Sequence, residues 1–155
     1  MDTTDRTEFR YTTYIRTTPG RLWQVLTDPA FTTVWWQATV VDSTWETGAS
    51  MTWRHKGAVM AHPEQVVLEA DPPRRLSFTW HTFTPEWADA IGFDADEAAT
   101  IAAEPRSTAT FDLEPDGDVV KLTVTHGNLL PDGLISQGWP RLLSDLKSLV
   151  ETGTV

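Results

Sequence analysis

The sequence predicts an α+β fold in which a curved antiparallel sheet of about six to seven strands packs around one long C-terminal helix. Three observations support this prediction. Most of the chain alternates apolar and polar residues with the period-two pattern of strands, two short helical segments follow the first strand, and the final segment has the spacing of an amphipathic helix. Packing that helix on the sheet buries the apolar faces of both.

The N-terminal segment predicts one strand and two short helices. Alternate residues from 9 to 15 are aromatic or β-branched, which is typical of a strand. Thr18 followed by Pro19 has the pattern of a helix start, because the hydroxyl can cap free amides and a proline at the first helical position loses no hydrogen bond. The Asp-Pro pair at 28–29 ends this helix, and a second short helix is expected over 30–36.

The middle of the chain predicts successive antiparallel strands. Residues 38–55 give two strands joined around 46–48, and a further strand is expected from Gln65 to Ala70. The paired prolines at 72–73 form a turn, since proline cannot donate to a strand ladder. Residues 76, 78 and 80 then lie on one apolar face of the next strand.

Residues 85–105 interrupt the strands with an acidic helical excursion. Asp94 and Glu97 have the spacing of a capping box. Acidic residues recur through the segment, and such a run is usually a solvated face. We also consider the excursion as a lid over a binding site, since mobile segments beside a site commonly gate it. Its inward-facing residues would then be Trp87, Ile91 and Phe93.

A hairpin and a long helix complete the prediction. Apolar residues alternate over 109–113 and 120–126 on either side of a turn expected at Pro115-Asp116-Gly117. The helix is expected over 139–152, with Gly153 as its stop. Its apolar stripe consists of Trp139, Leu142, Leu143, Leu146, Leu149 and Val150.

Composition restricts the function classes. A chain of 155 residues is most simply one domain, here 1–155. Its formal net charge of -10 opposes nucleic-acid binding. The charged N-terminal segment does not resemble a signal peptide, and the chain has no long apolar run, so we expect a cytoplasmic protein without membrane insertion. With no cysteine, no metal-type histidine spacing and no glycine-rich nucleotide loop, neither a metal nor a cofactor is expected.

Five blocks of sequence carry a resemblance to a known family. They are YTTYIRTTPGRLWQVLTDP at 11–29, WW at 35–36, DPPRRLSFTWH at 71–81, LTVTH at 122–126 and GWPRLLSDLKSLVETG at 138–153. In this order they resemble bacterial proteins related to the C-terminal domain of the Hsp90 ATPase activator Aha1, within the START-like superfamily, also called SRPBCC or Bet v 1-like. The resemblance implies a helix-grip fold with a hydrophobic pocket between sheet and helix. It transfers no catalytic residue onto this chain.

The strand phases, together with the predicted helices, bring eleven residues toward one cavity as candidate ligand contacts. A mostly apolar pocket with a few polar groups is the usual form of a small-molecule site. The alternative is that the same aromatic residues pack against one another as an ordinary core. The eleven are Trp36, Trp53, His55, Phe78, Trp80, Phe111, Leu122, Val124, His126, Trp139 and Leu143.

His126 is the best candidate for a catalytic residue, although no catalytic set is established. A histidine at the end of an apolar face can be a hydrogen-bonded structural residue, a ligand contact or a general base, and the first of these is the commonest. His81 falls on the opposite strand face from Trp80 and is expected at the surface.

Three functions are consistent with these observations. The first is non-catalytic binding of a small hydrophobic or aromatic molecule in a cavity between sheet and helix. The second is an interaction protein, either a chaperone co-factor or the partner of a regulator. The third is an enzyme of the polyketide cyclase or hydrolase kind, with His126, His55 or Tyr11 moving protons. An exposed edge strand would also permit a homodimer.

Overall fold

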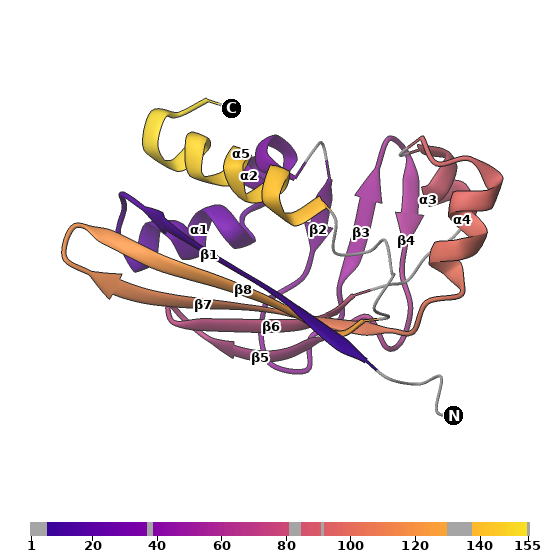
Figure 1. The fold of residues 1–155 in the computed structure, drawn as a ribbon, viewed down its shortest axis with the longest axis horizontal. Helices are drawn as coiled ribbons and strands as arrows, with labels where there is room; N and C mark the ends of the chain where they lie inside the picture. The colour runs from indigo at the N-terminus through magenta and orange to yellow at the C-terminus, as the bar shows by residue number, and fades with distance from the viewer. Residues whose placement is uncertain (1–5, 37–38, 81–84, 91, 130–137, 155) are drawn as a thin grey trace.

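The computed structural model describes residues 6–36, 39–80, 85–90, 92–129 and 138–154. In these ranges, eight strands form two antiparallel sheets: five strands in the order β1-β8-β7-β6-β5 and three in the order β2-β3-β4. Helices α1, α2 and α5 lie over one face of the larger sheet, and the smaller sheet stands at one end of it (Figure 1). The predicted α+β helix-grip arrangement is therefore confirmed.

The first strand and two helices form where the sequence predicts them. β1 spans Thr7–Ile15, α1 spans Pro19–Thr27 and α2 spans Pro29–Trp35. The Thr18 hydroxyl accepts a hydrogen bond from the Arg21 amide at 3.2 Å. The Asp28 carboxylate similarly accepts a hydrogen bond from the Ala30 amide. In each helix the capping residue is therefore followed directly by a proline at the first helical position.

The smaller sheet contains a strand that the sequence analysis missed. β2 is Val40–Asp42, β3 is Thr52–His55 and β4 is Ala58–Met60. Lys56 and Gly57 connect β3 to β4 with φ angles of 48° and 84°, the left-handed pair that a tight hairpin turn requires. With β4 the described strands number eight, which exceeds the predicted six to seven.

The larger sheet continues with four longer strands. β5 is Val67–Asp71, β6 is Arg75–Trp80, β7 is Ser107–Asp116 and β8 is Val119–Leu129. The last turn differs from the prediction: Asp116 pairs with Val119, so the turn consists of Gly117 and Asp118 rather than residues 115–117. Pro115 is tolerated within β7 because the pairing with β6 extends only as far as Arg75 opposite Asp112, so no second partner strand needs its missing N–H.

The excursion between β6 and β7 contains two short helices. α3 is Pro85–Ala90 and α4 is Ala95–Ala102. The capping box is complete: the Glu97 amide donates to the Asp94 carboxylate at 2.8 Å, and the Asp94 amide donates to the Glu97 carboxylate at 3.2 Å. Both helices lie at the end of the molecule beside β3 and β4 (Figure 1).

The C-terminal helix α5, Trp139–Thr152, buries the first part of its apolar stripe and ends at Gly153 with φ 85°. Its last turn is tied to the end of β1. The Lys147 ammonium donates to the Tyr14 carbonyl, and the Glu151 carboxylate accepts from the Arg16 amide at 2.8 Å. Across the described residues, no helix is long and apolar enough to cross a membrane.

Candidate functional site

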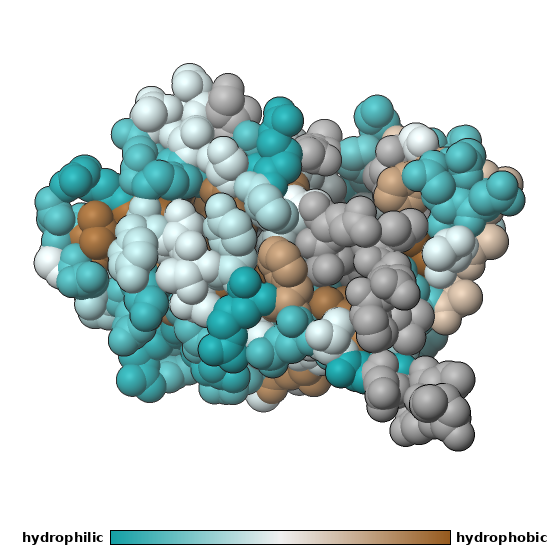
Figure 2. All heavy atoms as spheres, in the orientation of Figure 1, coloured by the Kyte–Doolittle hydropathy of each residue, from teal (hydrophilic) through white to brown (hydrophobic). Residues whose placement is uncertain are grey.

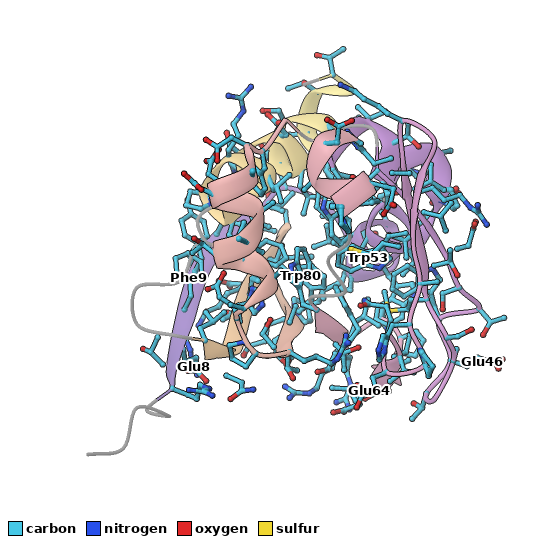
Figure 3. The ribbon with its side chains drawn as sticks, turned by 90° about the vertical axis from the view of Figure 1, so that its right-hand side faces the viewer. Glu8, Phe9, Glu46, Trp53, Glu64 and Trp80 are labelled. Carbon is cyan, nitrogen blue, oxygen red and sulfur yellow. The ribbon has the colours of Figure 1, made fainter. Side chains whose placement is uncertain are left out.

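Five rings surround Trp80 at the end of β6, and we call these six residues the Trp80 cluster. The centroid of the Trp80 ring system lies 4.7 to 6.0 Å from the centroids of Trp36, Trp53, Phe78, His126 and Trp139. Trp53 and Trp80 lie close together inside the molecule when it is viewed from the α3–α4 end (Figure 3). The cluster joins the larger sheet, the smaller sheet, α5 and the end of α2.

Strand alternation brings these rings to the same side. Phe78 and Trp80 share the inward face of β6, and Phe78 is level with Ala109 and His126 on the next two strands. Ala109 is small, which leaves room above it for the larger rings. The first residue of α5, Trp139, occupies part of that room, with its ring 5.7 Å from Phe111.

All eleven predicted ligand contacts lie on the inner side, but their rings touch one another. Except for the half-buried Trp80, they are buried, and Leu122, Val124 and Leu143 belong to the same hydrophobic core. Among the predicted lid residues, Trp87 packs against Trp53 and His55, and Phe93 is half-buried. Ile91 and His81 lie outside the described residues. The contacts between rings are those expected of a core.

His126 is fully buried and both of its ring nitrogens have partners. The Trp139 indole N–H donates to Nδ1 at 2.8 Å, so in the neutral ring Nε2 carries the proton and donates to the Ser107 hydroxyl at 2.7 Å. Burial lowers the pKa of His126 to about 4. This geometry favours the hydrogen-bonded structural role over that of a general base.

Within the part of the chain that the structure describes, two polar atoms on the inner face of β3 lack a hydrogen-bond partner. They are Nε1 of Trp53, whose side chain is 3% exposed, and Nδ1 of His55, which is 7% exposed. Both rings face Trp87 of α3, with centroid distances of 6.3 and 5.7 Å. Burial, and secondarily the charge of Lys56, lowers the pKa of His55 and favours its neutral form. Unpaired buried polar atoms are uncommon in native proteins and call for an explanation.

Ser107, which accepts the hydrogen bond from the protonated nitrogen of His126, was not among the residues predicted from the sequence. The signal was available, because Ser107 lies two residues before Ala109 and therefore on the same inward face of β7. The residue that it would meet depends on the pairing of β7 with β8, which the alternation alone does not specify.

Two hollows lie on the opposite, polar face of the five-stranded sheet. Their volumes are about 300 and 720 Å³, and Arg10, Arg75 and Asp112 line both. Arg75 is already paired with Glu69 at 3.0 Å and with Asp112 at 2.7 Å. Because these charges neutralise one another in solvent, this face offers a weaker basis for a binding site than the Trp80 cluster does.

Comparison with known proteins agrees with the fold. The family model for Activator of Hsp90 ATPase homolog 1-like protein matches residues 16–151. No curated protein sequence matches the chain.

Solved structures give the same result. The crystal structure of MLL2253 from Mesorhizobium loti has 24% identity and a TM-score of 0.68, covering 92% of this chain and 96% of that one. The Aha1 dimer from Colwellia psychrerythraea has 18% identity and a TM-score of 0.69, covering 96% and 99%. DynU16, from the dynemicin biosynthetic locus, has 18% identity and a TM-score of 0.68, covering 95% of this chain and 48% of its own. At these identities the likeness establishes a shared fold.

Proposed function

Because the chain belongs to the family of Activator of Hsp90 ATPase homolog 1-like proteins, we propose that it binds a small hydrophobic or aromatic molecule between the five-stranded sheet and α5. The observation that carries this proposal is the position of Trp80. Trp80 as a whole residue is only partly buried, although five other rings surround its ring system. An incompletely buried tryptophan at the centre of an aromatic cluster is a favourable contact for a flat apolar ligand.

We propose that α3 acts as the lid of this site. Trp87 lies on the two β3 side chains with unpaired nitrogens, so it covers the cluster from the α3–α4 end. The rings of the cluster are in mutual contact, which means that a ligand has to displace either a ring of the cluster or the Trp87 ring that covers it. Trp87 is a suitable candidate because it belongs to a helix of only six residues.

The geometry of His126 disfavours a role for this residue as a general base. A general base needs a nitrogen that is free to accept a proton near neutral pH. Both nitrogens of His126 are engaged, and its lowered pKa makes it a weak base at that pH.

Thermal unfolding with a panel of flat aromatic compounds tests the proposal. At about one hundred times Kd, a ligand that binds only the native state stabilises it by roughly 2.7 kcal/mol. In a chain of this length that raises Tm by about 5 to 10 °C. We expect the rise to be lost in Trp80→Leu and kept in Trp23→Phe, a matched control because Trp23 is half-buried on α1 outside the cluster.

Absence of any response to the compounds would favour the alternative function, an interaction protein. If no compound raises Tm or quenches tryptophan fluorescence, the mutual contacts of the rings are those of an ordinary core. The family description, which names the Hsp90 ATPase, would then point to a protein partner as the better explanation.

A further inference from the structure

We infer that β3 recognises a hydroxyl group of a neutral, hydroxylated aromatic ligand through Nε1 of Trp53 and Nδ1 of His55. This inference rests on the proposed function and specifies its ligand class. Trp53 and His55 are two residues apart on the same inward face of the strand, so their Cα atoms are about 7 Å apart. A bicyclic aromatic molecule is long enough to contact both side chains.

The two unpaired nitrogens require a ligand with polar hydrogen-bonding groups. The indole N–H of Trp53 can only donate, so its partner must be an acceptor. A neutral imidazole nitrogen donates or accepts according to its tautomer. A hydroxyl group can accept a hydrogen bond from Trp53 and can pair with either tautomer of His55, because it both donates and accepts. A carbonyl group only accepts, and a purely apolar ligand would leave both nitrogens buried and unpaired.

The surroundings select against a charged ligand. Burial lowers the pKa of His55 and of His126, so neither provides a positive charge near neutral pH. Lys56, the residue next to His55, is exposed in the turn between β3 and β4. The net charge of the chain is -10, which repels anions at long range. A buried carboxylate would therefore lack a countercharge, whereas a neutral hydroxyl would not need one.

Three compounds of matched size test this inference by isothermal titration calorimetry: naphthalene, 2-naphthol and 2-naphthoic acid at neutral pH. We expect 2-naphthol to bind about tenfold more tightly than naphthalene, as one or two additional hydrogen bonds predict. The carboxylate should bind most weakly. In Trp53→Phe and His55→Leu the preference for 2-naphthol should fall to about twofold or less. Trp23→Phe should keep it.

The ratio of the two dissociation constants is the quantity to compare, because any general loosening of a variant affects both compounds. NMR of the unsubstituted protein gives a second readout that does not require a variant to fold. The Trp53 indole N–H resonance should move downfield with 2-naphthol and not with naphthalene.

The failures of the two proposals are distinguishable. Equal affinity for naphthalene and 2-naphthol, or a preference that survives in both β3 variants, would overturn the β3 inference while leaving hydrophobic binding intact. If none of the three compounds binds although another flat aromatic compound raises Tm, only the β3 inference fails. If no compound binds in either experiment, both proposals fail.

Discussion

At the level of single residues, burial determines the chemistry of His126. Its ring is closed in by Trp80 and Trp139, and its nitrogens are held by the Trp139 indole and the Ser107 hydroxyl. Desolvation opposes the charged form, which lowers the pKa to about 4 from an ordinary value of 6.5. In the neutral ring, Nδ1 can accept the hydrogen bond from the Trp139 indole N–H, but in the protonated ring it cannot.

This lowered pKa predicts a pH dependence of stability. Between pH 6.5 and 4 the unfolded chain binds a proton at His126 that the folded chain does not, so the free energy of unfolding falls as the pH falls through this range. At pH 4 the loss approaches about 3 kcal/mol. Urea unfolding at pH 7 and pH 4 gives the loss of unfolding free energy for the unsubstituted protein and for His126→Gln. The loss should be smaller in His126→Gln by about that amount. The carboxylates titrate in both proteins, so their contribution cancels in the comparison.

His62→Gln is the matched control for this experiment, because His62 is exposed. It should keep the full pH dependence of the unsubstituted protein. An identical pH dependence in His126→Gln and in the unsubstituted protein would show that His126 titrates normally when folded.

At the level of elements, the capped helices show how local sequence sets the boundaries of a structure. α1, α2 and α4 each begin after a side chain that accepts hydrogen bonds from the first free amides. The α4 cap is reciprocal, with Glu97 returning a hydrogen bond to the Asp94 amide. These interactions involve residues within one turn, so they depend little on the rest of the fold.

Removal of the α4 cap should therefore have a local and measurable effect. Asp94→Ala is expected to lower the free energy of unfolding by about 1 kcal/mol, because the Glu97 amide loses its acceptor. Asp94→Asn keeps an acceptor oxygen and should remain within a few tenths of a kcal/mol of the parent. Urea unfolding of the three proteins measures both values. An equal loss in both variants would mean that charge, rather than capping, is what Asp94 contributes.

At the level of the whole molecule, the surface is strongly acidic. Atoms of hydrophilic residues cover much of the face in Figure 2, with hydrophobic atoms in small patches between them. The described ion pairs, such as Arg54 with Asp42 at 2.7 Å, are largely solvent-exposed and contribute little individually. Self-repulsion from a net charge of -10 is spread over the whole chain.

Added salt screens both the repulsion among the excess acidic groups and the attraction within the ion pairs. We expect the screening of the repulsion to have the larger effect on stability. Raising NaCl from about 20 mM to about 500 mM shortens the screening length from roughly 20 Å to less than 5 Å. We expect the urea midpoint to rise, with a gain on the order of 1 kcal/mol in the free energy of unfolding. A falling midpoint would show instead that the surface ion pairs dominate the electrostatic contribution to stability.

The sequence by itself determined the elements and their inward faces. Side-chain direction repeats every two residues in a strand and every 3.6 in a helix, and caps act within one turn, so short stretches carry this information. That is why the inward face of β3, the capped starts of the helices and the stop of α5 at Gly153 could all be predicted.

Only the tertiary structure decided which inward side chains meet. The pairing of Ser107 with His126, the contact of Trp87 with β3, and the unpaired nitrogens of Trp53 and His55 join segments far apart in the chain. Such contacts depend on strand register and on the path of the excursion, and period-two alternation specifies neither. The short strand β4 and the position of the last turn differed from the prediction because each depends on where strand pairing ends.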